Sequence, residues 1–217
     1  MKRVPSGLAG LDGLINGGFP QNSCILVSGG AGAGKTLFGL NFVANGANAG
    51  EKSCYISFNE GESDLLRAAN GMGLEVKNVP IKHMDLTQDI TITEFMKTIE
   101  AYPELDRVVV DSVNKLLLFS TDETDYRYQL CRLVKFLKKT AKASLLVCET
   151  DGDRMDSDNG EAFECDGVIG ISFLELEEKP MRTLQIHKMR YTAIEPKVAH
   201  ELEIDSKGLR LSKRKGI

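Results

Sequence analysis

Residues 29–36 read GGAGAGKT and combine small residues, one lysine and one hydroxyl in a fixed order. They satisfy the pattern G-x-x-x-x-G-K-[ST] in full. In this pattern the small residues let backbone N–H groups turn inward around phosphates, the lysine places a charge between the β- and γ-phosphates, and the threonine hydroxyl serves Mg²⁺. The alternative is a flexible glycine loop that binds nothing. The residues predicted to hold the phosphates of a nucleotide are Gly29, Gly30, Ala31, Gly32, Ala33, Gly34, Lys35, Thr36 and Leu37.

A phosphate cradle of this kind needs a second anchor for Mg²⁺, and the carboxyl end of a neighbouring parallel strand is the natural place for it. The segment RVVVDS supplies three β-branched residues followed by Asp111. We therefore expect Thr36 and Asp111 to hold Mg²⁺, Asp111 through a water molecule. The alternative role for Asp111 is an N-cap of the following helix.

The surrounding elements alternate in a simple way. Apolar β-runs are expected at residues 23–28, 53–58, 107–112 and 144–149, with a further short strand in IKHMDL. Helical patterns lie between them, including a capping box formed by Thr91 and Glu94. Strands that alternate with helices predict a mostly parallel twisted sheet with helices on both faces. After Asp166 only β-patterns follow, which predicts antiparallel hairpins at the edge of the sheet. The segments between the elements contain no linker, so we expect one domain over residues 1–217.

Composition excludes several classes of protein. The chain carries a net charge of −4, and 27% of its 217 residues are charged. No stretch approaches the roughly 20 apolar residues that a bilayer span needs. MKRVPSG has no apolar run behind it, which predicts no signal peptide and a cytoplasmic protein. The five cysteines are scattered, against both a disulfide framework and a zinc site.

Several segments together resemble one family. They are SGLAGLDGLINGGFPQNSCILVSGGAGAGKTLF, ISFNEGESDL, VVVDSV, LLVCETD and HKMRYT. This set is similar to the KaiC-type ATPases of the RecA superfamily, in their short single-domain form, over nearly the whole chain. The resemblance implies a RecA-like α/β core that binds ATP and Mg²⁺ between subunits of a ring, commonly of six. It also implies a regulatory or signalling switch with a protein partner that the sequence does not name.

The same resemblance assigns roles to two further places. Similar proteins use a Lys-x-Arg pair on a late strand to reach the γ-phosphate of the neighbouring subunit, and the matching residues are Lys188 and Arg190. A solvated basic strand face is the alternative. Similar proteins that hydrolyse ATP often carry two adjacent glutamates after the second strand, where this chain has Asn59 and Glu60. An amide can hold a water but cannot accept its proton, so Glu60 becomes the candidate base. We expect a slow ATPase, and a nucleotide-locked scaffold that barely hydrolyses ATP is the rival.

The RecA superfamily also contains DNA strand-exchange proteins, which makes recombination another alternative. The loop ETDGDRMDSDNGEAFECD, however, has eight acidic residues against the single base Arg154. Such a loop repels a phosphate backbone, so direct DNA binding is not expected, although a paralogue that modulates recombination through protein contacts stays open. The tail Lys213-Arg214-Lys215 is interpreted as a solvated end.

Overall fold

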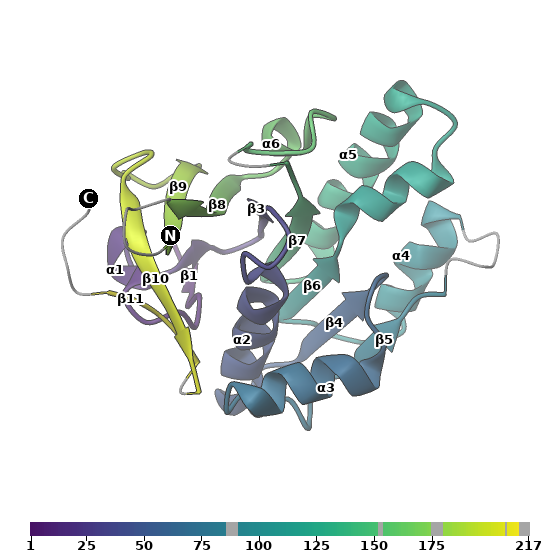
Figure 1. Ribbon diagram of the computed structural model, residues 1–217. Coiled ribbons are helices and arrows are strands. Elements are labelled where there is room, and N and C mark those ends of the chain that lie inside the picture. The colour runs from purple at the N-terminus through teal and green to yellow at the C-terminus, as the bar shows by residue number, and fades with distance from the viewer. Residues whose placement is uncertain (86–90, 152–153, 175–179, 207, 213–217) are drawn as a thin grey trace.

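The computed structural model describes residues 1–85, 91–151, 154–174, 180–206 and 208–212. The predicted basic tail at 213–215 lies outside them. The elements in chain order are β1 (Arg3–Val4), α1 (Leu11–Leu14), β2 (Phe19–Pro20), β3 (Ser23–Gly29), α2 (Lys35–Asn48), β4 (Ser53–Ser57), α3 (Glu62–Gly71), β5 (Ile81–His83), α4 (Ile92–Glu100), β6 (Arg107–Asp111), the 3₁₀ helix η1 (Val113–Phe119), α5 (Glu123–Thr140), β7 (Ala143–Glu149), α6 (Glu161–Glu164), β8 (Gly167–Leu174), β9 (Met181–Met189), β10 (Ala199–Asp205) and β11 (Gly208–Leu211) (Figure 1).

Within the described residues, one large sheet has the order β11-β10-β9-β8-β3-β7-β6-β4-β5. The strands from β8 to β5 in that order run parallel to one another, and β9, β10 and β11 add antiparallel pairs at the other edge. The predicted α/β class is therefore confirmed, including the switch to antiparallel hairpins late in the chain. β8 is the strand at which the direction changes, since it pairs parallel with β3 and antiparallel with β9.

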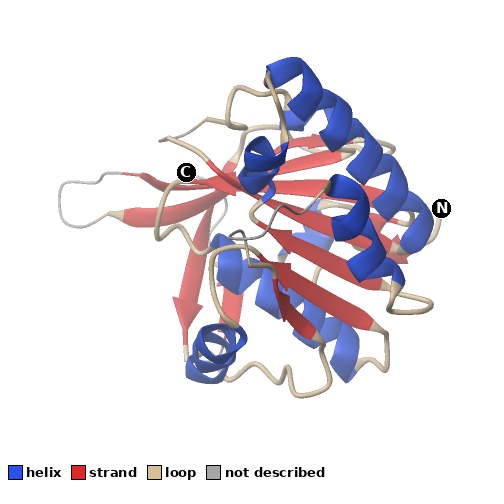
Figure 2. Cartoon of the chain, turned by 90° about the vertical axis from the view of Figure 1, so that its right-hand side faces the viewer, coloured by secondary structure: helices blue, strands red, loops and turns tan. Residues whose placement is uncertain are grey.

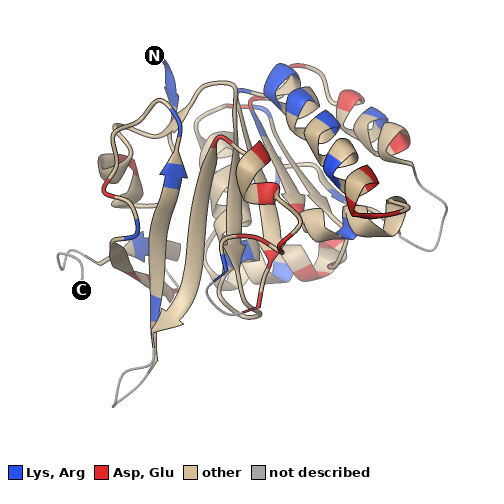
Figure 3. Cartoon of the chain, turned by 90° about the horizontal axis from the view of Figure 1, so that it is seen from above, with Lys and Arg blue, Asp and Glu red and all other residues tan. Residues whose placement is uncertain are grey.

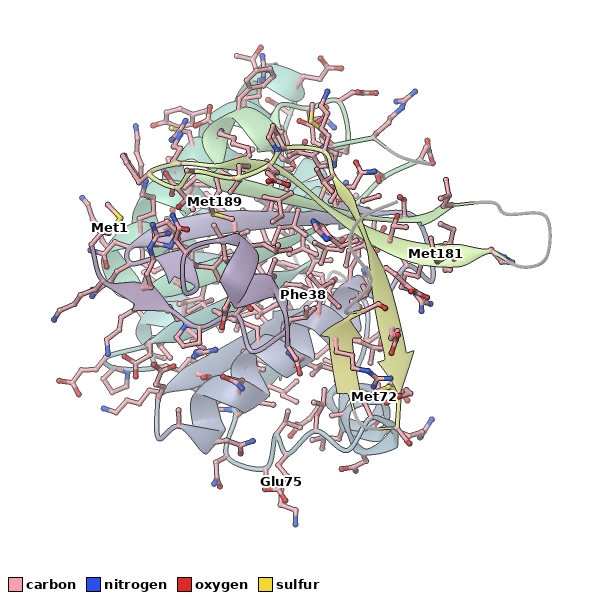
Figure 4. All side chains as sticks on the ribbon, turned by 90° about the vertical axis from the view of Figure 1, so that its left-hand side faces the viewer. Met1, Phe38, Met72, Glu75, Met181 and Met189 are labelled. Carbon is pink, nitrogen blue, oxygen red and sulfur yellow. The ribbon has the colours of Figure 1, made fainter. Side chains whose placement is uncertain are left out.

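Helices cover both faces of the parallel part of the sheet, and the alternation of side chains along a strand explains why. In β6, Val109 points into the apolar cluster under α2 and α3, whereas Val108 and Val110 join the cluster under α4 and α5. Figure 2 shows α5 lying across the strands on its side of the sheet. On the opposite side, Phe38 of α2 is fully buried in the interior, while Met1 and Glu75 lie at the periphery (Figure 4).

Several local predictions can be compared with the elements. The capping box at the start of α4 is present, with the Thr91 N–H donating to the Glu94 carboxylate and the Glu94 N–H donating to the Thr91 hydroxyl. The strand expected in IKHMDL is shorter and ends at His83. The antiparallel pair of β1 and β2, the helix η1 and the helix α6 were not predicted, because each element is too short to show a period in the sequence.

The carboxyl ends of the parallel strands meet at one edge of the sheet. Gly29 of β3 pairs with Glu149 of β7, and Ser57 of β4 pairs with Asp111 of β6. The loops that follow these residues therefore lie next to one another at the carboxyl ends of the strands. Ligands bind at this end in open α/β sheets. Among the described residues, no helix has the length and apolarity needed to cross a membrane.

Candidate functional site

The glycine-rich loop between β3 and α2 depends on backbone conformations that glycine adopts at low cost. Gly32 and Gly34 have φ values of 72° and 102°. A Cβ at position 34 would stand 2.7 Å from a methyl group of Ile204, so a larger residue there would also meet β10. The Lys35 ammonium folds back over the loop and donates to the carbonyl of Gly30 at 2.8 Å. On the outer side, the guanidinium of Arg182 in β9 donates to the carbonyl of Gly32.

Lys35 lies in a partly buried and charged environment. Burial lowers the pKa of its ammonium group, and the carboxylates of Glu149 and Asp111 act in the opposite direction. These two carboxylates favour the charged form of the ammonium group, which is the form that binds phosphate. Leu37, by contrast, packs against the apolar cluster beneath α2. Its predicted contact with a nucleotide can therefore involve only its backbone.

Thr36 and Asp111 lie together as the sequence predicted. The Thr36 hydroxyl donates to Asp111 Oδ2 at 2.8 Å, and the same oxygen accepts from the hydroxyl of Tyr55 at 2.6 Å. Burial raises the pKa of Asp111, and these two hydrogen bonds oppose the rise. A hydroxyl and a carboxylate at this separation fit Mg²⁺, which prefers oxygen ligands and usually keeps several waters. A bound Mg²⁺ would neutralise charge on the phosphates there.

Asn59 and Glu60 follow β4 but have different neighbours. The Asn59 amide donates to the carboxylate of Glu149 at 2.8 Å and lies 3.5 Å from the Ser112 hydroxyl. The Glu60 backbone N–H donates to the Ser57 hydroxyl at 3.0 Å. Burial raises the pKa of the Glu60 carboxyl, and the nearby charge of Asp111 raises it further. The predicted role of Glu60 as general base stays a prediction.

These groups line one cavity of about 530 Å³. Its walls come from the glycine-rich loop, the ends of β4, β6 and β7, and the loop after β7. The lining residues are Ala31, Gly32, Lys35, Thr36, Asn59, Glu60, Asp111, Glu149, Thr150, Asp151, Arg154, Asp156 and Ser157. The volume is in the range of small-molecule sites, and the polar lining suits a charged ligand.

The acidic loop after β7 is partly folded inward. Glu161 is fully buried and accepts from the Tyr126 hydroxyl at 2.6 Å. Asp166 is also buried and accepts from the Lys138 ammonium at 2.8 Å. Among the described residues of this loop and of α6, the remaining acidic residues still outnumber the single base Arg154. Figure 3 colours the acidic positions of the chain red and the basic ones blue. The exposed negative charge of this segment is therefore smaller than the count of acidic residues in the sequence indicates. It is still negative, which argues against direct DNA binding.

Lys188 and Arg190 lie away from the cavity of their own chain. Lys188 Nζ donates to the carbonyls of Ala162, Phe163 and Cys165, at 2.8, 3.2 and 2.7 Å. Arg190 donates to the Phe163 carbonyl and to Asp166. Both residues thus bind the segment that carries α6. Their predicted action on the ATP of a neighbouring subunit stays a prediction, and it requires that these hydrogen bonds be exchanged.

Two residues of the cavity network were missed by the sequence reasoning. Glu149 appeared only as the end of a strand, although the argument that selected Asp111, a carboxylate at the carboxyl end of a parallel strand, applies to it equally. Tyr55 was read as one more apolar residue of β4. Its hydroxyl gives no sequence signal, because a buried tyrosine finds its partner through tertiary packing.

A family model described as ATPase: KaiC matches residues 4–216 of the chain. The chain belongs to this KaiC family. Membership supports an ATP-binding domain of RecA type. A solved KaiC-like protein from the hyperthermophilic archaeon Pyrococcus horikoshii is 28% identical, with a TM-score of 0.86 over 97% of this chain and 99% of that one. The predicted RecA-like fold and the predicted family are therefore both confirmed.

Curated relatives fall into two groups by length. A UPF0273 protein of Pyrococcus horikoshii is 28% identical over 232 residues, which cover 96% of this chain and 93% of the relative. The circadian clock protein KaiC3 of Synechocystis is 29% identical over 222 residues, but these cover 97% of this chain and 44% of the clock protein. This KaiC-family chain therefore matches the UPF0273 protein end to end and less than half of the clock protein.

Proposed function

We propose that this chain is one ATPase domain that binds Mg·ATP in the 530 Å³ cavity and hydrolyses it slowly. The observation that carries the proposal is the convergence of Lys35 with the hydrogen-bonded pair Thr36 and Asp111 at one cavity. Lys35 and the N–H groups of residues 29–37 hold the phosphates, and Thr36 and Asp111 hold Mg²⁺. Hydrolysis also needs a proton acceptor for the attacking water, and Glu60 is the residue that the sequence selects.

We further propose that ATP lies between subunits of a homo-oligomer, where Lys188 and Arg190 reach the γ-phosphate of the neighbouring subunit. Their position away from the cavity of their own chain supports this, since they face the segment around α6. Two cations at that place would stabilise charge on the transferring phosphoryl group. Nucleotide-dependent assembly would make the protein a regulatory or signalling switch for a protein partner.

A second candidate function is an ATP-locked scaffold that binds ATP and hydrolyses almost none of it. The amide at Asn59 favours this candidate, because it cannot accept a proton at neutral pH. The two candidates differ in turnover and agree in binding. Involvement in recombination through protein contacts has no support in the geometry of this site.

The experiment compares ATP affinity and phosphate release for the wild type, Lys35→Ala and Glu60→Gln. The proposed ATPase predicts binding and slow release that both depend on Lys35. Tight binding without Lys35-dependent release would leave the scaffold, and absence of binding would reject both. Light scattering with and without Mg·ATP tests the assembly. A monomer under both conditions would reject the roles of Lys188 and Arg190 in a neighbouring site.

A further inference from the structure

The hydrogen bond between Asn59 and Glu149 joins the ends of two strands that are not neighbours in the sheet. The two residues follow β4 and end β7, and β6 lies between these strands. They are 90 residues apart in the chain, and the Asn59 amide donates to Glu149 Oε1 at 2.8 Å. The same amide nitrogen lies 3.5 Å from the hydroxyl of Ser112, just after β6. The pair therefore crosses above the strand that carries Asp111.

The backbone of Glu149 is held firmly. Its N–H donates to the side-chain oxygen of Asn114 at 2.7 Å, and its carbonyl accepts from the Asn114 amide at 3.1 Å. Glu149 is also the last residue of β7 and pairs with Gly29 of β3. A side chain that starts from such a fixed backbone and accepts a hydrogen bond from Asn59 has few orientations left. This is the preorganisation that a catalytic group needs.

The amide at position 59 suits a carboxylate at position 149. The neutral N–H of Asn59 donates to this carboxylate, whereas a second carboxylate at position 59 would repel it. Because the amide nitrogen is used for Glu149, the amide oxygen of Asn59 is available to accept from a water molecule. The pair thus offers two acceptors, one amide oxygen and one carboxylate, on the same side of the cavity.

Glu149 and the phosphate-binding Lys35 line the same cavity. Among the charges that act on Lys35, that of Glu149 is the largest. Glu60 instead interacts with the carboxylates of Asp111 and Asp64, on the side of the proposed metal. Since Lys35 marks the position of the β- and γ-phosphates, the Glu149 carboxylate lines the cavity in which water would attack the γ-phosphate.

We infer that Glu149, oriented by Asn59, accepts the proton of the attacking water. This inference rests on the proposed ATPase function. The water oxygen forms a bond to the γ-phosphorus, and the bond from that phosphorus to the β,γ-bridging oxygen breaks, with its electron pair leaving on ADP. One water proton moves to the Glu149 carboxylate and then to solvent. The products are ADP and phosphate, and the amide at position 59 positions the water without taking its proton.

The test uses Glu149→Gln, which keeps the size of the side chain and removes the proton acceptor. Glu60→Gln tests the rival proton acceptor in the same cavity, and Glu104→Gln, which breaks an exposed ion pair outside the cavity lining, is the control expected to leave turnover unchanged. Phosphate release is measured at saturating Mg·ATP, and ATP affinity is measured by titration. We expect Glu149→Gln to lower turnover by about 100-fold or more, as the loss of a general base does, and Glu60→Gln to lower it by less than about tenfold. Because a negative charge near the phosphates is removed, Glu149→Gln should bind ATP several-fold more tightly than the wild type.

The outcomes separate this inference from the proposal beneath it. A wild type that hydrolyses ATP in a Lys35-dependent way, together with a Glu149→Gln variant of equal turnover, would overturn the role of Glu149 and leave the ATPase intact. Unchanged ATP affinity in Glu149→Gln would also count against it, since the carboxylate would then lie away from the phosphates. No Lys35-dependent release by the wild type would overturn both. A thermal midpoint within a few degrees of the wild type confirms that Glu149→Gln is folded.

Discussion

Tyr55→Phe removes one hydroxyl from the buried network beneath the glycine-rich loop. Tyr55 is fully buried, and its hydroxyl donates to Asp111 Oδ2 at 2.6 Å. Asp111 is itself only 5% exposed, so water does not easily replace the lost donor. After the substitution, the carboxylate retains the hydrogen bond from Thr36. The variant therefore leaves a buried negative charge with one side-chain donor fewer.

The magnitude follows from the type of hydrogen bond. A hydrogen bond to a charged group contributes about 1.5 to 3 kcal/mol to the free energy of unfolding. In a domain of this size each kcal/mol corresponds to roughly 2 to 4 °C, so the thermal midpoint of the nucleotide-free protein should fall by about 3 to 12 °C. Mg·ATP should reduce this loss of stability, because a cation held at Asp111 would stabilise the negative charge that the Tyr55 hydroxyl stabilises in the wild type.

Tyr126→Phe is the matched control for this prediction. Tyr126 is also fully buried, and its hydroxyl donates at 2.6 Å to the buried carboxylate of Glu161, which lies on α6 and outside the cavity lining. The two variants should lose similar stability in calorimetry without nucleotide. Only Tyr55→Phe should regain part of it when Mg·ATP is added. An unchanged midpoint for Tyr55→Phe, or an equal response of both variants to Mg·ATP, would refute the reasoning.

Two further predictions concern residues outside the cavity. Asp166→Asn removes a buried charge that accepts from Lys138 and from the backbone N–H of Cys24, and we expect it to lower the free energy of unfolding by about 2 to 4 kcal/mol in urea titrations. Glu104→Gln breaks an exposed ion pair and should leave the urea midpoint unchanged. Equal midpoints for Asp166→Asn and Glu104→Gln would contradict the stabilising role of Asp166. Burial and the charge of Lys197 lower the pKa of His187 below its ordinary value of 6.5, so the folded state binds this proton less readily than the unfolded state. The free energy of unfolding should therefore decrease as the pH is lowered below about 6.5, and it should decrease less steeply in His187→Gln. Identical pH profiles of the two proteins would show that His187 does not contribute.

The parts of the site that are local in sequence could be predicted. The loop at 29–36 contains the complete phosphate-binding motif. Asp111 directly follows an apolar strand, and that strand was expected to lie next to the loop in the sheet. The alternation of strands and helices was enough to give the parallel sheet and the helices on both faces. These predictions succeed because each rests on a local motif or on the order of elements along the chain.

The contacts between distant segments could not be predicted in the same way. Asn59 and Glu149 meet only because β4 and β7 end at one edge with β6 between them, and strand order is not visible in a single sequence. Lys188 is a comparable case, since its three carbonyl partners belong to the α6 segment, which has no sequence signature. The sequence identified Asn59 as a change in chemistry, and the structure shows which carboxylate lies next to it.

The most direct test of the central proposal is a single-turnover measurement of phosphate release from protein-bound ATP with Mg²⁺ present. The wild type and Lys35→Ala are compared at equal occupancy by ATP. The account predicts slow release by the wild type and a loss of at least about 100-fold in Lys35→Ala, because Lys35 supplies the charge between the β- and γ-phosphates. Equal rates in the two proteins, or no release from wild-type protein with ATP bound, would contradict it.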